Sequence, residues 1–292
     1  MIISRTPLRI SFAGGGTDIK SYYNKRKYGN VISCGINLYI YIAVKKQSPI
    51  TDFKYKIKWD KIENCNSIDE IKHPIIKAAI KYFNITDNLE IITYSDVPVS
   101  SGLGSSSTFT VGLVNAFLAY LGKRATKGQM ADLAAKIEID ILKRNIGKQD
   151  HYAASYGKLH EYIFLDDETV EVHPIITDKR TISHIEKRCS LFFTNQKRDA
   201  SMILKKTKIE LNLDTLDKIK SQVNDYRELF MTKINLNRFG NYLHEGWKLK
   251  KSMSKFITSN NINLNYRKAL KNGALGGKIL GAGGGGFMLI YS

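Results

Sequence analysis

The stretch Pro98-Val-Ser-Ser-Gly-Leu-Gly-Ser-Ser-Ser-Thr108 decides the interpretation of this chain of 292 residues. It follows a segment at 89–94 that is predicted to be a strand, and it leads directly into the apolar run 109–121. It is therefore predicted to lie where a strand ends and a helix begins. Backbone N–H groups at a helix N-terminus have no partner within the helix, and the helix dipole favours an anion there. We interpret the stretch as a phosphate cradle.

A flexible Ser/Gly turn or an ordinary N-cap cluster would also explain these serines, since serine is a favoured cap residue. One cap needs one serine, whereas this stretch has five, and Gly102 and Gly104 bracket Leu103 as if the backbone approaches a ligand closely. The stretch lacks the lysine of a Walker A loop, and Ser107 stands at the third glycine position of a dinucleotide-binding fingerprint. If this stretch binds a phosphate, it does so neither as a Walker A loop nor as a dinucleotide-binding loop.

The composition is that of an ordinary globular protein, long enough for one large domain or two moderate ones. No apolar run approaches the ~20 residues needed to cross a bilayer. The N-terminus lacks the charged-then-apolar order and the small-residue cleavage site of a signal peptide, so we expect a cytoplasmic protein. The three cysteines are far apart, which favours reduced thiols over disulfides or a zinc site. The formal net charge of +18 raises the question of nucleic acid, but scattered lysines favour a solvated basic surface or attraction of small phosphorylated substrates.

A glycine-rich turn follows the first predicted strand, in which Leu8, Ile10 and Phe12 alternate with polar residues. The turn reads Ala13-Gly-Gly-Gly-Thr-Asp18, and its glycines permit close approach of a ligand. Arg9 and Asp18 supply one charge of each sign nearby. Alternatively, Arg9 is a solvated strand residue and Asp18 is the N-cap of a helix at 19–23.

A helix is predicted at 126–144, introduced by the capping box Thr126-x-x-Gln129. Glu138 lies on the edge of its apolar stripe, and a buried carboxylate needs a partner because an unpaired buried charge costs several kcal/mol. That partner is either a metal ion or a lysine or arginine from elsewhere. Asp150 follows in Ile146-Gly-Lys-Gln-Asp150, where it is either a general base or the N-cap of a helix at 152–156.

A second unit is predicted to begin near Asp178, with a strand at 189–194 and helical patterns over 216–230 and 243–256. Trp247 and Lys250 share a helix face with Leu243, which places them either along a cleft or, for Trp247, in the core. Strands at 278–280 and 287–291 are joined by glycines at 281–286 that spell G-x-G-x-x-G. No helix can follow this loop, so a glycine-rich hairpin beside a ligand fits better than a dinucleotide site.

Three motifs in this order resemble those of the GHMP small-molecule kinases, and the resemblance spans nearly the whole chain. They are Thr6-Pro-Leu-Arg-Ile-Ser-Phe-Ala-Gly-Gly-Gly-Thr-Asp18, Pro98-x-x-x-Gly-Leu-Gly-Ser-Ser, and Gly281-Ala-Gly-Gly-Gly-Gly-Phe287. The resemblance implies an α/β (α+β) fold of two domains with ATP in the cleft between them. The N-terminal domain, 1–177, would carry the phosphate-binding loop and resemble the second domain of ribosomal protein S5. The C-terminal domain, 178–292, would be ferredoxin-like.

The same resemblance implies roles for individual residues. Asp150 would orient and deprotonate the attacking sugar hydroxyl, and Arg9 is the second catalytic position. Ser106 and Glu138 would hold Mg²⁺. The positions implied for ATP are Ser100, Ser101, Gly102, Leu103, Gly104, Ser105, Ser106 and Ser107. The positions expected to bind the sugar substrate are Gly15, Gly16, Thr17, Asp18, Gly283 and Gly284. A phosphate on the sugar would need a cationic anchor, for which Arg198 is the first candidate and Lys148 the second, although each is equally well explained as a surface residue.

The resemblance is to the sugar-1-kinase branch that includes heptose 7-phosphate kinases. It implies ATP-dependent phosphorylation of the anomeric hydroxyl of a sugar phosphate, with a heptose 7-phosphate as acceptor and ATP and Mg²⁺ as cofactors. One alternative is a sugar-1-kinase for an unphosphorylated sugar such as fucose or galactose. Another is a basic RNA-binding protein without catalysis, for which the interleaved stretch Lys54-Tyr-Lys-Ile-Lys-Trp59 would be the contact surface. RNA binding gives no reason for an acid at Glu138.

Overall fold

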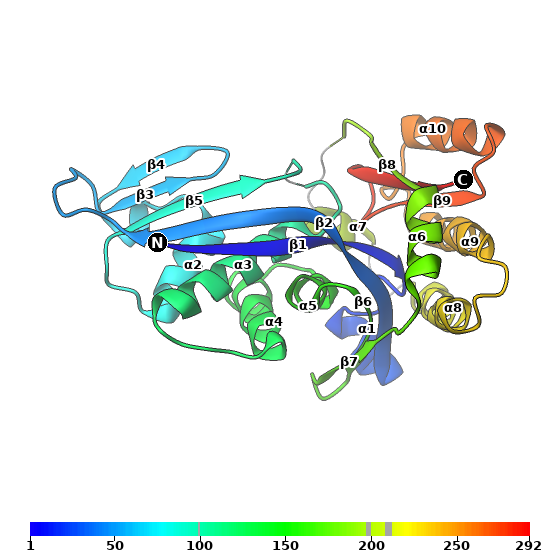
Figure 1. Cartoon of the computed structure of the whole chain (residues 1–292), viewed down its shortest axis with the longest axis horizontal. Helices are drawn as coiled ribbons and strands as arrows, with labels where there is room; N and C mark the ends of the chain where they lie inside the picture. Colours follow the sequence, from blue (N-terminus) through cyan, green and yellow to red (C-terminus); the bar gives the residue numbers. More distant parts are fainter. Residues whose placement is uncertain (99, 197–199, 208–211) are drawn as a thin grey trace.

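The computed structural model describes residues 1–98, 100–196, 200–207 and 212–292. In this part of the chain the longest strand, β2 (Tyr28–Lys46), organises the larger of two sheets (Figure 1). β1 (Ile2–Ala13) pairs antiparallel with β2 along most of its length. Two further strands share the other edge of β2, namely β5 (Leu89–Ser95) with its C-terminal half and β6 (Leu159–Leu165) with its N-terminal half. The remaining strands of this sheet are β3 (Tyr55–Lys58), β4 (Ile62–Cys65) and β7 (Val170–Pro174).

The strands form where alternation predicted them, because one face of each is buried. In β2, Ile40, Ile42 and Val44 are buried, whereas Tyr41 and Ala43 between them are partly exposed. The register between β1 and β2 shifts at Pro7/Arg9 and again at Ser11/Ala13. Such irregularities bend a strand and re-aim its side chains. They lie at the end of β1 that leads into the glycine-rich turn, and so they shape the site described below.

Helices cover one face of this sheet, and the central one is buried on nearly all sides. Figure 1 shows α3 with α2, α4 and α5 on the same side of the strands. α3 is apolar around its whole circumference, which is the pattern of a helix enclosed by other elements. The helices of this unit are α1 (Lys20–Arg26), α2 (Pro74–Phe83), α3 (Ser105–Tyr120), α4 (Lys127–Ala135), α5 (Gln149–Tyr156) and the short η1 (Ile68–Glu70).

The second unit contains a smaller antiparallel sheet with the last strand in its middle. The order is β8 (Cys189–Phe193), β10 (Phe287–Tyr291) and β9 (Gly276–Ile279). Its helices are α6 (Lys179–Arg188), α7 (Ala200–Thr207), α8 (Leu213–Thr232), α9 (Arg238–Ser252) and α10 (Asn260–Lys271). Phe12 of β1 packs against Tyr226 of α8 and Phe239 of α9, so the two units share one core.

Three local predictions differ from the structure. The helix predicted over 126–144 is α-helical only in α4, and it continues as a π-helical segment, η2 (Lys136–Ile141), closed by the Leu142 N–H donating to the Ile137 carbonyl. Asp150 lies inside the first turn of α5, so it is not an N-cap. Nor is Asp18, because Ile19 occupies that position before α1. The capping box at Thr126 is confirmed. No helix of the described residues is both long and apolar enough to cross a membrane.

Candidate active site

A cavity of about 1030 Å³ lies where the two units meet. Residues from all the glycine-rich motifs line it, together with the segment around Asp150. The predicted site residues along its wall are Arg9, Gly15, Gly16, Asp18, Ser100, Gly102, Gly104, Ser105, Ser106, Ser107, Asp150 and Gly283. Set back from the wall are Thr17, Ser101, Leu103, Glu138, Lys148 and Gly284. Arg198 lies outside the described residues.

The predicted phosphate cradle lies at the N-terminus of α3, as the strand-to-helix pattern indicated. Gly104 is the N-cap in a left-handed conformation with φ 76°, and Ser105 begins the helix. Gly102 also has positive φ, and a Cβ there would lie 2.7 Å from the Leu280 carbonyl oxygen. A side chain at residue 102 would therefore collide with the backbone of Leu280, so the cradle and the loop after β9 can pack closely only because this residue is glycine.

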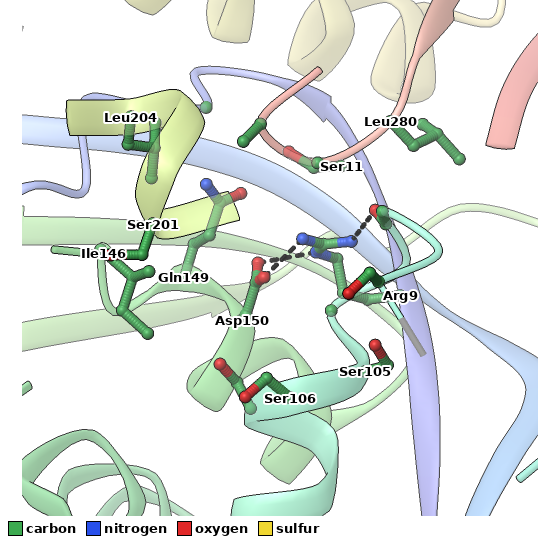
Figure 2. A pocket seen from close by; sticks show the side chains of 18 of the residues that line it. Arg9, Ser11, Ser105, Ser106, Ile146, Gln149, Asp150, Ser201, Leu204 and Leu280 are labelled. Carbon is green, nitrogen blue, oxygen red and sulfur yellow. Dashed lines mark hydrogen bonds and ion pairs between the residues drawn. The ribbon is translucent and has the colours of Figure 1, made fainter. Parts of the chain in front are cut away.

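Arg9 and Asp150 form a bidentate ion pair at the cavity wall. Arg9 Nε donates to Asp150 Oδ1 over 2.7 Å, and Nη2 donates to Oδ2 over 2.5 Å (Figure 2). The third guanidinium nitrogen, Nη1, donates to the Gly102 carbonyl over 2.8 Å. Arg9 is 2% exposed, whereas the Asp150 side chain is 25% exposed. Arg9 therefore connects the cradle to a carboxylate that still faces the cavity.

Asp18 is buried beside this pair and holds the segment that carries Asp150. Its carboxylate accepts hydrogen bonds from the Gly16 N–H, the Gln149 N–H and Gln149 Nε2, at 3.0, 3.1 and 2.9 Å. Burial, aided by the charge of Asp150, raises the pKa of Asp18 to about 6 against the lowering effect of the Gln149 backbone hydrogen bond. A neighbouring hydroxyl donor would be a favourable partner for this carboxylate.

The packing of Gly147 against Asp18 gives a testable prediction. A Cβ at residue 147 would lie 1.9 Å from Asp18 Oδ2, so Gly147→Ala must displace that carboxylate. We expect kcat/KM for the acceptor to fall about 10- to 100-fold, since small misplacements of site groups have costs of this size. Gly128→Ala is the matched control, because its added Cβ would meet nothing closer than 3.4 Å. Equal acceptor kinetics for the two variants would contradict a substrate role for Asp18.

Other predicted substrate residues have partners within the protein. The Thr17 hydroxyl is buried, where it donates to the Gly14 carbonyl and accepts from the Asn30 N–H, so it holds the glycine-rich turn together. Lys148 Nζ is 2.8 Å from Glu168 Oε2, which neutralises its charge away from the cavity wall. The Gly284 N–H donates to the Ile257 carbonyl over 2.7 Å.

Glu138 is fully buried in a compact polar cluster behind the cradle. Ser106 Oγ and Arg144 Nη1 donate to its Oε1 over 2.6 and 2.7 Å, and the His151 Nε2–H donates to Oε2 over 2.9 Å. Arg144 also donates to Ser106 Oγ over 2.6 Å. Burial alone would raise the pKa of Glu138, but His151, Ser106 and Arg144 together hold it at about 2. A cation thus already sits against both predicted metal-binding oxygens.

Aromatic rings line another part of the cavity. Trp59 and His73 pack edge to face with ring centroids 4.9 Å apart, and His73 lies 4.8 Å from Phe109. Burial lowers the pKa of His73 to about 4, so its ring is neutral at physiological pH. Trp59 Nε1 donates to Glu63 Oε1, while Tyr55 and Ile57 point into the core. Of the aromatic residues in the 54–59 stretch, Tyr55 is buried in the core and Trp59 lines the cavity.

Comparisons with known proteins agree with this geometry. Residues 72–158 match the sequence model described as the GHMP kinases N terminal domain. Over 99% of its length the chain is 34% identical to the D-glycero-alpha-D-manno-heptose 7-phosphate kinase of Campylobacter jejuni, covering 89% of that protein. The chain belongs to the GHMP kinase family. The family resemblance predicted from the three motifs is therefore confirmed.

Two solved structures support the fold of this GHMP kinase. A D-glycero-D-manno-heptose 1-phosphate kinase from Bacteroides thetaiotaomicron superposes with a TM-score of 0.80 at 26% identity, covering 100% of this chain and 88% of that one. A putative sugar kinase from Campylobacter jejuni superposes with a TM-score of 0.72 at 29% identity, covering 99% and 87%. The predicted α/β fold is thereby confirmed. The boundary between 177 and 178 stays a prediction, although α6 begins nearby at Lys179.

The sequence patterns do not single out several wall residues of this GHMP kinase. Gln149 adjoins Asp150 and contacts Asp18, and Arg144 lies at the end of the predicted helix over 126–144 and contacts Ser106. Lys278 stands next to the glycine-rich loop at 281–286. Position beside a motif was the available signal for Gln149 and Lys278. For Arg144 there was none, because the π-helical segment that places it follows from tertiary packing.

Proposed function

We propose that this GHMP kinase transfers the γ-phosphoryl group of ATP to the anomeric hydroxyl of D-glycero-D-manno-heptose 7-phosphate, forming the 1,7-bisphosphate. The observation that carries the proposal is the Arg9–Asp150 pair, which lies between the cradle at the start of α3 and the turn that holds Asp18. One carboxylate thus faces both a candidate phosphate site and a candidate sugar site. The heptose 7-phosphate kinase that is 34% identical supports the choice of acceptor.

The cavity suits a nucleotide in two respects. The backbone N–H groups of the first turn of α3 can donate hydrogen bonds to a bound anion, and the helix dipole adds to their attraction for negative charge. The neutral rings of Trp59, His73 and Phe109, which pack edge to face and tilted against one another, offer apolar contacts for a base. We infer that the phosphates of ATP bind at the cradle with the base toward these rings. Because ATP is the donor, we place the reaction in the cytoplasm.

The residues at Glu138 fit a magnesium ion. Mg²⁺ prefers oxygen ligands and is usually held by one or two protein groups plus phosphate oxygens. Ser106 Oγ and Glu138 Oε1 are two such oxygens 2.6 Å apart, and the guanidinium beside them shows that the pair attracts a cation. Within the described residues no group of three or more acidic, His or Cys side chains could hold a metal alone, so nucleotide oxygens would complete the set. When bound, Mg²⁺ would neutralise phosphate charge during transfer.

The chain's own residues then account for the transfer. Asp150 accepts the proton of the anomeric hydroxyl, whose oxygen forms a bond to the γ-phosphorus as the bond from that phosphorus to the bridging oxygen breaks and ADP leaves. Arg9 fixes the orientation of Asp150 through its two hydrogen bonds. Asp18 and the buried Ser11 hydroxyl, which has no partner among the described residues, are available to ring hydroxyls.

A substrate panel tests the proposal. ADP release is measured with ATP and Mg²⁺ in the presence of heptose 7-phosphate, unphosphorylated heptose, fucose or galactose, and a chelator control removes the metal. We expect kcat/KM to be highest for heptose 7-phosphate and activity to be lost with the chelator. Equal turnover of fucose or galactose would overturn the choice of acceptor, and activity without metal would overturn the magnesium site.

A further inference from the structure

Two lysine side chains enter the cavity from the C-terminal unit. Lys278 of β9 is 8% exposed, and its Nζ donates to the Phe12 carbonyl over 3.0 Å. Lys250 of α9 donates from Nζ to the carbonyls of Ile279 and Gly281. Both residues line the cavity, and each ammonium group has three N–H donors. Lys278 therefore keeps two donors for a ligand and Lys250 keeps one.

Lys250 and Lys278 differ from the two arginines of the site in having no acidic partner, and from Lys143 on the cavity wall in being less exposed. Arg9 is paired with Asp150 and Arg144 with Glu138. Across the part of the chain that the structure describes, no carboxylate oxygen lies within 4.0 Å of Lys250 or Lys278. Withdrawing a charged group from water is costly unless a counter-charge is supplied. The missing counter-charge points to an anionic ligand.

The electrostatic surroundings support the same conclusion. Burial, and to a lesser extent the charge of Arg9, lower the pKa of Lys278 to about 8. Burial also lowers the pKa of Lys250. The charges of Lys278 and Arg9 lower it too, whereas the charge of Asp150 raises it. Arg9, Lys250 and Lys278 thus influence one another, and of the nearby carboxylates Asp150 is already paired with Arg9 and Asp18 with Gln149. A bound dianion would relieve the mutual repulsion of the three cations.

The position of the pair favours the acceptor side of the cavity. Lys278 reaches the backbone of Phe12, directly before the glycine-rich turn that carries Asp18. Arg9 acts on the pKa of both lysines and Asp150 on that of Lys250, whereas the pKa of Glu138 responds to His151, Ser106 and Arg144. On the nucleotide side, Arg144 and the N-terminus of α3 already supply positive charge, which leaves Lys250 and Lys278 for the acceptor.

We propose that Lys250 and Lys278 bind the phosphate group already present on the acceptor sugar, and so select phosphorylated over unphosphorylated acceptors. This inference rests on the proposed function and assigns the substrate phosphate to residues other than Arg198 and Lys148. The γ-phosphate of ATP has the same chemistry and is the competing occupant. The two are separated by which substrate's kinetics respond to substitution.

The test compares Lys250→Met and Lys278→Met with the wild type, using heptose 7-phosphate, unphosphorylated heptose and ATP. The selectivity ratio is kcat/KM for heptose 7-phosphate divided by kcat/KM for heptose. We expect each substitution to lower this ratio at least about 10-fold, the effect of losing one charged hydrogen bond, while KM for ATP changes less than about 2-fold. Lys248→Met is the matched control on the same helix, because Lys248 is exposed and pairs with Glu245. It should leave the ratio and both KM values unchanged.

Two results would overturn the inference. An unchanged ratio with a raised KM for ATP would assign the lysines to the γ-phosphate, and an unchanged ratio with unchanged KM values would leave them without a ligand. Protection of each variant against thermal unfolding by heptose 7-phosphate, without nucleotide, provides a readout independent of turnover; full protection in both variants would also overturn it. A wild-type enzyme that does not prefer the phosphorylated sugar would refute the proposed function itself, whereas a preference retained by the variants refutes only the role of the lysines.

Discussion

Asp150→Asn is expected to lower turnover at least about 100-fold, the usual scale for loss of a general base. An amide cannot accept the proton of the attacking hydroxyl, although it keeps nearly the shape of the carboxylate and one acceptor for Arg9. Nucleotide binding should be retained, because the cradle and Glu138 are unchanged. The variant should therefore bind ATP as the wild type does but form ADP slowly, because the transfer step itself is slowed.

Kinetics and binding must be measured together for this variant. Single-turnover transfer from ATP follows the chemical step, and titration calorimetry with a non-hydrolysable ATP analogue follows binding. The matched control is Asp217→Asn, which weakens an Arg–Asp pair with Arg26 at 3.0 Å outside the cavity. Wild-type turnover in Asp150→Asn would show that the residue only orients Arg9. Loss of nucleotide binding along with turnover would show that the pair supports the cradle.

Glu138→Gln is expected to have the second large effect, on stability and on Mg²⁺-dependent nucleotide binding. The pKa of Glu138 falls from 4.5 to about 2 on folding, so between these values the unfolded state binds more protons than the folded state. The stabilisation is thus fully present above about pH 4.5 and is lost as pH falls through about 2. A shift of this size corresponds to about 3 kcal/mol of unfolding free energy at pH 7.

Denaturant unfolding of wild type and Glu138→Gln across pH 2–7 checks the first effect. The difference in unfolding free energy should be about 3 kcal/mol at pH 7 and should shrink toward zero near pH 2. Glu90→Gln is a matched control, because Glu90 is a largely buried carboxylate that pairs with Lys45 and Lys56 and does not line the cavity. A pH-independent difference would indicate lost packing rather than a lost charge.

Nucleotide titrations check the second effect. In the presence of Mg²⁺, affinity for ATP should fall further in Glu138→Gln than in Ser105→Ala, because the cradle has no lysine and the metal must neutralise much of the phosphate charge. Without Mg²⁺ the two variants should differ little. Equal losses with and without the metal would remove Glu138 from the magnesium site and leave it as the partner of Arg144.

The sequence alone was sufficient for the local features of this protein. The cradle at the start of α3, the capping box of α4 and the strands around β2 follow from short patterns of apolar, glycine and cap residues. Such patterns act within one turn or one strand, where backbone geometry and burial of one face decide the outcome. The order of three motifs then identified the family, and with it the fold.

Only the tertiary structure decided how charged residues pair. Arg9 meets Asp150 across 141 positions of sequence, and Lys278 reaches Phe12 across 266. The partner of Glu138 stayed open between a metal and a cation until a π-helical segment placed Arg144 against it. Lysine side chains look alike in a sequence of net charge +18, and two of them are set apart by lining the cavity with backbone carbonyls rather than carboxylates as partners. Local pattern specifies which backbone can form, whereas the partner of a charge depends on which distant strands and helices the fold brings into contact.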